Sequence, residues 1–424
     1  MPDLLTITLG HTGTMIGIEY WKRIFKEHER KLGNLNEWES RGEEDVNIHF
    51  FWKGDEREGK ACPRCIAIDL DPRSIETLLR EIQIDEEYVK GRRSGIGGTG
   101  RRWKKGYNSG EVINDKEDVM GTLEGFSGEV DGIIIIISLG GGIGSGVGSW
   151  LIEKIRENEK LKDKYVIAFV VLPAPIESKR ESVAVSPYNA VFALNRFSKY
   201  ADVIVLFDNQ ALQSAIRSIG NRAGVRIEDL NPAIANVIAI ITSLSRFPRG
   251  HDLLNVLTNC TPSERCKFVI PSVFPFPGLE DAKGTLPERA MNALNKEHVL
   301  VDCDIKSGDI GVMSLIVRKR GDFEIDVIEA ATQSIGEEFG PEMIAYELAG
   351  APDGYNSEDI VVLINSYNIA ERLNIIYNEA KRLFDRNRYV HWYERDGMRR
   401  EDIENELNEF KEMVDKINEG GVGE

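Results

Sequence analysis

The chain has 424 residues, enough for two or three domains, and its formal net charge is −17. An excess of acid of this size argues against general nucleic-acid binding, because nucleic acid is itself a polyanion. The first residues contain no basic region, and no apolar run approaches the roughly 20 residues that cross a bilayer. We therefore expect a cytoplasmic protein with no signal peptide and no membrane contact.

Apolar runs alternate with stretches of helical periodicity, which predicts an α/β fold. In the first half we predict strands at Leu4–Leu9, Val46–Trp52, Ile66–Ile68, 132–137, Val166–Leu172 and Asp202–Phe207. In the second half we predict strands at Lys267–Phe276, His298–Cys303, Ile310–Arg318 and Ile360–Asn365. Helices are predicted at Thr14–Glu29, Pro187–Tyr200, from Asn231 onward, and at Pro287–Asn295, Val327–Glu338, Ile369–Arg386 and Glu401–Asn418.

The first predicted strand leads into a glycine loop, Gly10–Gly17, and then into a helix. A turn from strand to helix offers backbone N–H groups to a phosphate, and glycines let the chain approach it closely. An ordinary turn of this kind is the alternative, although it needs fewer glycines.

Two carboxylates, Asp69 and Asp71, follow the strand that ends at Ile68. Open α/β sheets bind ligands at the carboxyl ends of their strands, and Mg²⁺ prefers oxygen ligands. The two side chains are therefore candidates for holding Mg²⁺ or another cation. Because Pro72 follows, either residue is also a candidate cap for the next helix.

The most informative stretch is Ser138–Gly146, which reads Ser-Leu-Gly-Gly-Gly-Ile-Gly-Ser-Gly after five consecutive isoleucines. An apolar run of this kind is typical of a central strand in a parallel sheet, and the helix start beyond the loop is a phosphate site. The loop lacks the lysine of a P-loop and the Gly-x-Gly-x-x-Gly spacing of a dinucleotide site. Gly95–Gly100 has that spacing, but charged residues precede it and no clear helix follows.

Five cysteines, an odd number in a long chain without a signal, predict free thiols. Cys62 and Cys65 have the spacing of a metal or redox pair, and Cys260 and Cys266 form the other near pair. Zinc ribbons usually carry two matching knuckles, so we interpret the cysteines as inert, with a zinc site as the alternative.

These stretches resemble the tubulin/FtsZ superfamily, in the expected order and over nearly the whole chain. Ser138–Gly146 resembles the signature Gly-Gly-Gly-Thr-Gly-Ser-Gly, with Ile143 in place of threonine. Gly10–Gly17 resembles the first tubulin loop, Gly-Gln-Cys-Gly-Asn-Gln-Ile-Gly. Tyr389–Met398, with its His-Trp-Tyr, resembles a tubulin sequence that FtsZ lacks, which indicates a tubulin-like protein nearer to tubulin.

The resemblance implies a GTP-binding domain (1–208), a segment with a core helix and a catalytic-type loop (209–264), a second α/β domain (265–386) and surface C-terminal helices (387–424). It implies that GTP or GDP, with Mg²⁺ or another cation at Asp71, is bound by Gly10, His11, Thr12, Asp69, Gly98, Thr99, Gly100, Arg101, Ser138, Gly140, Gly141, Gly142, Ile143, Gly144, Asn209, Ile227 and Asn231.

The base would be read by Asn209 and Asn231, which match the two asparagines that recognise guanine in the family. An amide supplies both a donor and an acceptor, as the guanine edge requires. Asn231 precedes a proline, so it is also a candidate helix cap. Ile227 stands where the family has a stacking aromatic residue, and Ser186 stands where it has an acid near the ribose.

Gly98–Gly106 resembles the third tubulin loop, which contains two asparagines where this chain has Arg101 and Arg102. Lys104 and Lys105 follow the two arginines. Four cations beside a triphosphate would neutralise its charge, or they would simply be solvated. The residues do not separate these two alternatives.

The superfamily places two acidic residues, three apart, in the loop after the core helix, where they reach the nucleotide of the next subunit. Asp252 matches the first, and Asn255 replaces the second. The resemblance thus implies head-to-tail filaments of this chain that hydrolyse GTP between subunits, with Asp252 positioning water. Asp252 is alternatively only a helix cap. The other hypotheses are a filament scaffold with little hydrolysis and a dinucleotide-binding oxidoreductase.

Overall fold

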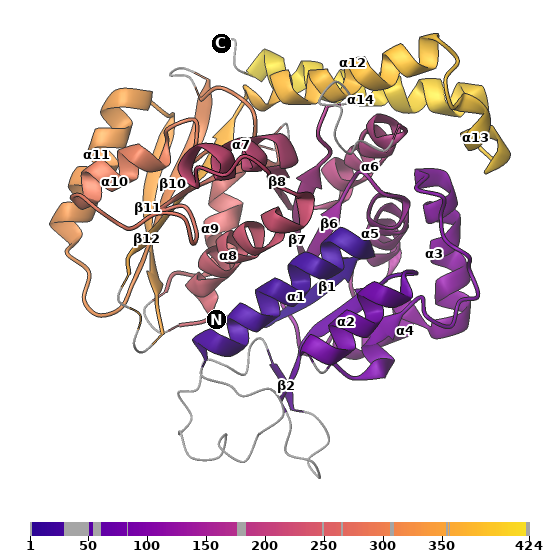
Figure 1. Cartoon of the computed structure of the whole chain (residues 1–424), viewed down its shortest axis with the longest axis horizontal. Helices are drawn as coiled ribbons and strands as arrows, with labels where there is room; N and C mark the ends of the chain where they lie inside the picture. Colours follow the sequence, from indigo (N-terminus) through magenta and orange to yellow (C-terminus); the bar gives the residue numbers. More distant parts are fainter. Residues whose placement is uncertain are drawn as a thin grey trace.

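The computed structural model describes residues 2–28, 51–53, 61–82, 84–175, 184–247, 250–263, 266–305, 309–352, 355 and 357–420. Within them one ten-stranded sheet runs through the molecule (Figure 1). Its strands, in spatial order, are β11 (Met343–Gly350), β10 (Ile310–Lys319), β12 (Asp359–Ser366), β9 (Phe268–Phe274), β8 (Val203–Asp208), β7 (Tyr165–Leu172), β6 (Gly132–Ser138), β1 (Leu4–Leu9), β4 (Cys65–Ile68) and β5 (Val89–Lys90). A separate antiparallel pair joins β2 (Phe51–Lys53) and β3 (Ala61–Pro63).

The strands from β5 to β9 are parallel, and β12 is antiparallel to both of its neighbours. The isoleucine run of β6 lies between β1 and β7, with Ile135 opposite Ile7 and Ala168. Helices cover both faces of the sheet, so these isoleucines are fully buried, as the sequence predicts. Because they are parallel, β4, β1, β6, β7 and β8 end on the same side of the sheet, and their carboxyl ends form one edge, across the strand direction.

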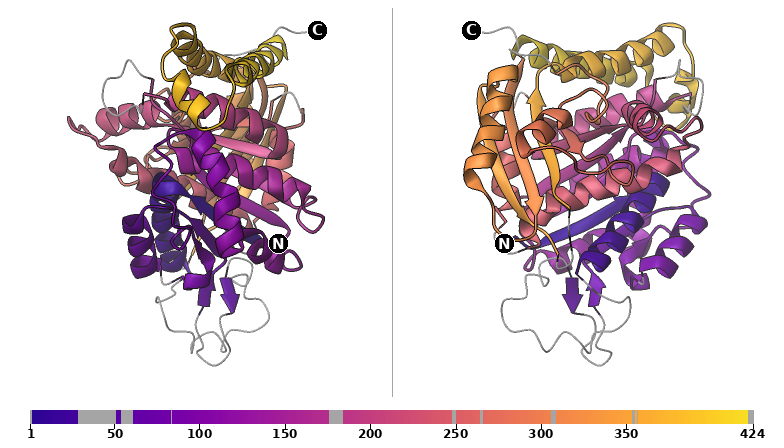
Figure 2. Two further views of the ribbon diagram at one scale, coloured as in Figure 1. Left: turned by 90° about the vertical axis from the view of Figure 1, so that its right-hand side faces the viewer. Right: turned by 60° about the vertical axis from the view of Figure 1, so that its left-hand side comes forward.

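Two hydrophobic cores lie on the two faces of the sheet. One face is covered by α1 (Gly10–Glu27), α2 (Pro72–Ile82), α7 (Asn209–Ile219), α8 (Asn231–Thr242) and α9 (Leu253–Cys260). The other is covered by α3 (Trp103–Glu117), α4 (Val119–Phe126), α5 (Gly148–Glu157), α6 (Ser186–Tyr200), α10 (Leu286–Ala293), α11 (Ile325–Phe339) and α12 (Ile369–Asp385). The last helices, α13 (Val390–Arg395) and α14 (Arg400–Gly420), lie with α12 on the outside of α6 (Figures 1 and 2).

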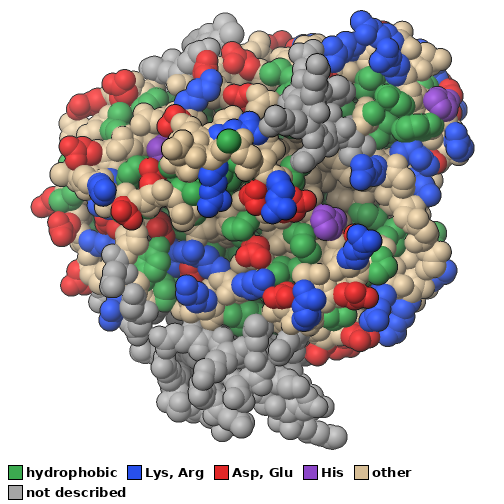
Figure 3. Space-filling model, viewed as in Figure 1, with side chains coloured by type: hydrophobic (Ala, Val, Ile, Leu, Met, Phe, Trp, Pro, Cys, Tyr) green, Lys and Arg blue, Asp and Glu red, His purple; other side chains and the backbone are tan. Residues whose placement is uncertain are grey.

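The core helix α8 is buried on nearly every side and packs along α1. With its flanking turns it forms the stretch Ile227–Ser245, which is long and apolar enough to cross a membrane, but 78% of the apolar window is buried inside the protein. This stretch is therefore the interior helix that the sequence predicts. On the face of the molecule shown in Figure 3, basic and acidic side chains are interspersed, so the negative charge is not concentrated in one patch there.

The structure departs from the sequence-based predictions at several places. Residues His298–Cys303 form bends with a single bridge between Val299 and Ser272, not a strand. The edge strand β11 was not predicted; its apolar residues are interrupted by Glu347 and several of them are partly or fully exposed. Helix α1 begins at Gly10, directly after β1, instead of near Thr14. The predicted strand from Val46 lies mostly outside the described residues.

The cysteines whose side chains are described, Cys65, Cys260, Cys266 and Cys303, are all free and buried. Burial raises the pKa of the Cys65, Cys260 and Cys303 thiols to about 12 and that of Cys266 to about 11. These thiols therefore stay protonated and behave as small apolar groups. The side chain of Cys62 lies outside the described part.

Candidate nucleotide-binding site

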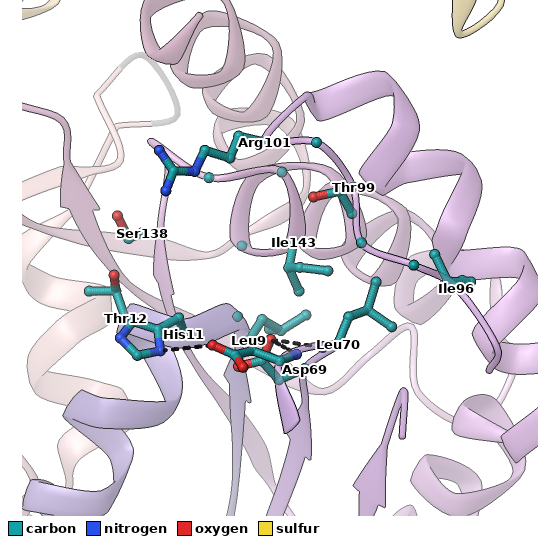
Figure 4. A pocket seen from close by; sticks show the side chains of 18 of the residues that line it. Leu9, His11, Thr12, Asp69, Leu70, Ile96, Thr99, Arg101, Ser138 and Ile143 are labelled. Carbon is teal, nitrogen blue, oxygen red and sulfur yellow. Dashed lines mark hydrogen bonds and ion pairs between the residues drawn. The ribbon is translucent and has the colours of Figure 1, made fainter. Parts of the chain in front are cut away.

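A pocket of about 640 Å³ opens at the edge where the parallel strands end (Figure 4). Four segments that the sequence singled out line it together: the start of α1, the acidic turn after β4, the glycine loop before α3 and the glycine loop after β6. Its lining residues are Leu9, Gly10, His11, Thr12, Asp69, Leu70, Asp71, Pro72, Ile96, Gly97, Gly98, Thr99, Gly100, Arg101, Ser138, Gly141, Gly142, Ile143 and Gly144.

The segment Gly95–Gly100 lies in this pocket although its motif alone is a poor indicator. It follows the two-residue strand β5, and α3 begins soon after it, which the sequence did not predict. The loop packs on Gly142, where a Cβ atom would lie only 2.5 Å from Oγ1 of Thr99 and 2.7 Å from the carbonyl oxygen of Arg102. A glycine is therefore required at position 142 for the two loops to meet.

Asn189, in α6, connects these two loops, and the sequence analysis did not single it out as a site residue. Its Nδ2 donates to the carbonyl oxygens of Arg101 (2.8 Å) and Gly140 (3.0 Å). Its Oδ1 accepts from the backbone N–H of Trp103 (2.7 Å) and from the hydroxyl of Tyr393 (2.7 Å). All of its hydrogen-bonding capacity is used, so it fixes the loops and supplies no contact to a ligand. Gly140 faces Asn189 and is not among the lining residues.

The acidic turn places two carboxylates at the pocket. Oδ1 of Asp69 accepts from the backbone N–H of Leu70 (2.8 Å) and of Asp71 (3.2 Å), while its Oδ2 is buried with no hydrogen-bond partner among the described residues. Burial raises the pKa of Asp69, against the lowering effect of these hydrogen bonds. Oδ2 of Asp71 lies 3.7 Å from Nδ1 of His11, which also lies 2.7 Å from Oγ of Ser74.

These residues fit a Mg²⁺ ion that takes most of its ligands from phosphates. Within the described residues no cluster of three or more potential metal-ligating side chains exists. Mg²⁺ on a nucleotide needs only one or two carboxylates beside the phosphates and water. The unpaired Oδ2 of Asp69 and the pocket-lining carboxylate of Asp71 meet that requirement. Oδ1 of Asp71 also accepts from the N–H of Arg73 (3.0 Å) at the start of α2, so the capping alternative holds as well.

The two adjacent arginines have different surroundings. Arg101 is exposed at the rim of the pocket, and its side chain reaches over the glycine loop that follows β6 (Figure 4). Arg102 turns away and pairs with Asp396, whose Oδ1 lies 3.0 Å from its Nη2. The hydrogen bonds that Arg102 donates to Asp396 raise the pKa of Arg102 against the effect of partial burial.

The predicted base-binding residues lie outside the described pocket lining but at the same edge of the sheet. Asn209 begins α7 directly after β8. Asn231 begins α8, which runs parallel to α1: Tyr20 and Thr242 lie 3.3 Å apart farther along, and Arg246 pairs with Glu27 where α1 ends. The starts of α1 and α8 therefore lie at the same end of the molecule.

Asn231 is not a helix cap, because a 3₁₀ helix, Ile227–Leu230, leads straight into α8. Its Oδ1 is buried and has no partner among the described residues. Ile227 is half-buried in the turn just before it. Ser186, which stands where the family has an acid near the ribose, has a buried Oγ that also lacks a partner among the described residues. An unpaired buried acceptor costs about 1–3 kcal/mol, which a bound ligand would relieve.

Asp252 and Asn255 lie at the opposite edge of the sheet from the pocket. Asp252 immediately precedes helix α9, and Asn255 lies within it. Helix α9 packs at the amino ends of the strands. A Cβ atom on Gly132 would lie 3.5 Å from Leu254, and the hydroxyls of Thr258 and Tyr165 are 3.1 Å apart. The seven residues of β6 separate the two edges by about 20 Å.

Asp252 caps α9, as the alternative interpretation holds. Its Oδ1 accepts from the N–H groups of Leu254 (2.9 Å) and Asn255 (3.1 Å). Asp252 is half-buried and Asn255 is exposed. Neither side chain can reach the pocket of its own chain across such a distance.

The fold and the site define an α/β protein with a glycine-lined pocket at the carboxyl ends of its parallel strands. The sequence matches the family model for the Tubulin/FtsZ family, GTPase domain, over residues 3–217. It is 27% identical to the tubulin beta-1 chain of Homo sapiens and 26% identical to the tubulin beta-1 chain of Geotrichum candidum. These similarities cover 99% of this chain and 92% and 93% of the two relatives. The chain belongs to the Tubulin/FtsZ family.

Proposed function

We propose that this chain is a cytoplasmic, cytoskeletal GTPase that binds GTP in the pocket and assembles head to tail into protofilaments. The observation that carries the proposal is the placement of the pocket and of Asp252 at opposite edges of one sheet. When identical subunits stack head to tail, the α9 edge of one subunit meets the pocket edge of the next. Such heterologous contacts form open filaments when no ring closes.

In the proposed complex each group has a separate role. The backbone N–H groups of the loops before α3 and after β6 hold the phosphates, and the start of α1 adds the partial positive charge of a helix N-terminus. Asn209 and Asn231 pair with guanine, and Ile227 packs against its face. The division into a GTP-binding domain, a central helical segment, a second domain and C-terminal helices remains part of this proposal.

The chemical step is attack of water on the terminal phosphate, for which the protein supplies position and charge. Asp69 and Asp71 would hold Mg²⁺, which neutralises phosphate charge when bound. The carboxylate of Asp252 from the neighbouring subunit orients the attacking water and accepts its proton. General-base help of this kind is worth about 10²–10⁴-fold in rate when the group is well placed.

A scaffold that assembles with little or no hydrolysis is the second candidate. Asn255 is exposed where the superfamily has a second acid, and an amide cannot accept the proton of water. Ile143 in the pocket also lacks the hydroxyl of the family threonine. Assembly without phosphate release would favour this alternative over the GTPase.

Mixed filaments test the contact between subunits directly. Asp252→Asn keeps a good helix cap, so this variant should fold and bind GTP but hydrolyse it at least about 10²-fold more slowly. Gly142→Val should block the pocket and leave the α9 edge intact. If hydrolysis needs one group from each subunit, a 1:1 mixture releases more phosphate than the two variants do separately. A mixture that releases only the sum of the two contradicts a shared site.

Electron microscopy of the same samples tests assembly independently. We expect filaments of the unaltered protein with GTP and with a slowly hydrolysed analogue, and far fewer with GDP. Nucleotide extracted from the purified protein should be GTP or GDP. Extraction of NAD instead would contradict the proposal and favour a dinucleotide-binding oxidoreductase.

A further inference from the structure

Arg101 and Arg102 stand where the third tubulin loop has two asparagines. In the structure the two arginine side chains have different surroundings. Arg102 is held by Asp396 and does not line the pocket. Arg101 lines the pocket and has no ion pair among the described residues. It is also the one lysine or arginine among the described lining residues, which otherwise include two carboxylates.

The backbone at Arg101 is held in an unfavourable conformation. Its φ of +59° lies in the left-handed region, which side chains other than glycine rarely adopt. Asn189 fixes this conformation through the 2.8 Å hydrogen bond from its Nδ2 to the Arg101 carbonyl oxygen. Strain of this kind persists only where the surroundings enforce it, and it tends to occur at binding sites.

The order of the strands places Arg101 toward the terminal phosphates. Asn209 follows β8, and the acidic turn follows β4, four strands away in the order β8-β7-β6-β1-β4. Neighbouring strands are about 4.8 Å apart, so the two positions are separated by about 19 Å. A nucleotide with its base at Asn209 therefore extends its phosphates toward β6, β1 and β4, where the loop carrying Arg101 closes the pocket.

We propose that Arg101 is a fixed cation for the terminal phosphates, which lets this chain bind GTP with less dependence on Mg²⁺. The inference rests on the proposed function, because it presumes that GTP occupies the pocket. A planar guanidinium donates two parallel hydrogen bonds to a phosphate, which an asparagine amide cannot match in charge. Arg102 is a positioning residue: its pair with Asp396 anchors the loop from outside.

The cleanest test is Arg101→Gly, because glycine adopts the left-handed conformation freely and the fold should survive the change. Equilibrium dialysis would measure GTP and GDP binding to the full chain in buffer with Mg²⁺ and in buffer with EDTA. In EDTA we expect the variant to bind GTP roughly tenfold or more weakly than the unaltered protein, with a smaller loss for GDP. With Mg²⁺ the loss for GTP should be smaller than in EDTA.

Two further variants serve as controls. Arg93→Gln removes a highly exposed arginine outside the pocket lining and should leave both affinities unchanged. Arg101→Lys keeps a charge without the planar fork and should fall between the glycine variant and the unaltered protein. Thermal melting of each variant verifies that it is folded.

The inference is overturned if Arg101→Gly binds GTP in EDTA as well as the unaltered protein does, or if GTP and GDP lose affinity equally. An unaltered protein that binds neither nucleotide would instead refute the proposed function. The two failures are therefore distinguishable.

Discussion

The hydroxyl of Tyr393 donates a 2.7 Å hydrogen bond to Oδ1 of Asn189. Burial raises the pKa of Tyr393 well above its ordinary value, so the hydroxyl remains a donor at any physiological pH. Through Asn189 this hydroxyl connects α13 with the two glycine loops of the pocket, and the pair between Arg102 and Asp396 forms a second connection. The His-Trp-Tyr segment is therefore part of the support of the pocket.

Removing the Tyr393 hydroxyl and removing the Asn189 amide should both weaken this support, but by different amounts. Tyr393→Phe deletes one of two bonds to Oδ1 and should lower the free energy of unfolding by about 1 kcal/mol. Asn189→Leu leaves two carbonyls, an N–H group and a hydroxyl unpaired and should cost about 3 kcal/mol or more. Urea denaturation measures both, and GTP affinity should fall in the same order. Tyr389→Phe, at a half-buried tyrosine nearby, is the control, and a loss equal to that of Tyr393→Phe would contradict the role of Asn189.

A pair of glycine-to-alanine changes should have opposite effects on stability. Gly106, in α3, approaches the glycine loop so closely that a Cβ atom would lie 1.8 Å from the carbonyl oxygen of Gly142. Gly106→Ala should therefore push the two loops apart, cost about 1–3 kcal/mol and weaken GTP binding. A Cβ atom on Gly125, in α4, would meet nothing within 4 Å beyond its own helix turn, so Gly125→Ala should stabilise the helix by about 0.5–1 kcal/mol. Denaturation and GTP titration of both variants check this, and equal effects would contradict it.

Three of the four pocket-lining segments could be predicted because parallel strands bring their carboxyl ends to one edge whatever the details of packing, whereas the Gly95–Gly100 loop was placed there only by the resemblance. Asn189 could not, because its partners lie 49, 86, 88 and 204 residues away and depend on how α13 packs. The one available signal was an amide at the start of an apolar helical segment. The two arginines are adjacent in sequence, so only the position of Asp396 separates their roles.

Local patterning failed at two segments. Residues 298–303 pack beside β9, but the two backbone hydrogen bonds between them, Val273 N–H to His298 and Leu300 N–H to Pro271, form a single bridge and not a strand. Strand β11 makes a full ladder with β10 but is only partly covered at the sheet edge, and Glu347 interrupts its apolar residues. The capping role of Asp252 was foreseen as the alternative, and its position away from the pocket of its own chain was implied by the resemblance alone, not by local pattern.

Asn231 should separate nucleotide affinity from stability. Its Oδ1 is buried without a partner among the described residues, so Asn231→Ala should leave the protein without nucleotide at least as stable and weaken GTP binding roughly 10–100-fold. The preference for GTP over ATP should also fall, because the amide is proposed to read guanine. Asn236, also in α8 and with an equally unpaired Oδ1, is the matched control. Loss of GTP affinity in Asn236→Ala but not in Asn231→Ala would refute the assignment.

Glu27 should make the protein sensitive to acid. It lies where α1 ends, with its carboxylate oxygens 2.8 Å from Nη1 of Arg246 and 2.8 Å from Nη2 of Arg318, and 2.7 Å from Nε of Arg23. Burial would raise the pKa of Glu27, but the three arginines outweigh it and lower the pKa from 4.5 to about 2. These pairs join α1, the end of the core helix and β10, so their loss would weaken the packing between these three elements.

Because the pKa is lowered in the folded state, the stabilisation from Glu27 is fully present above about pH 4.5 and is lost as the pH falls toward 2. The whole contribution is about 3 kcal/mol. Glu27→Gln takes the carboxylate away from buried Arg246 and leaves buried Arg318 with Asp359 alone (3.4 Å), so it should cost about 3–5 kcal/mol at pH 7. The difference between the two proteins should narrow by about 2 kcal/mol between pH 5 and pH 3, as measured by urea denaturation. Glu76→Gln, at an exposed position in α2, should show no such narrowing, and a constant difference for Glu27→Gln would mean that Glu27 does not titrate in this range.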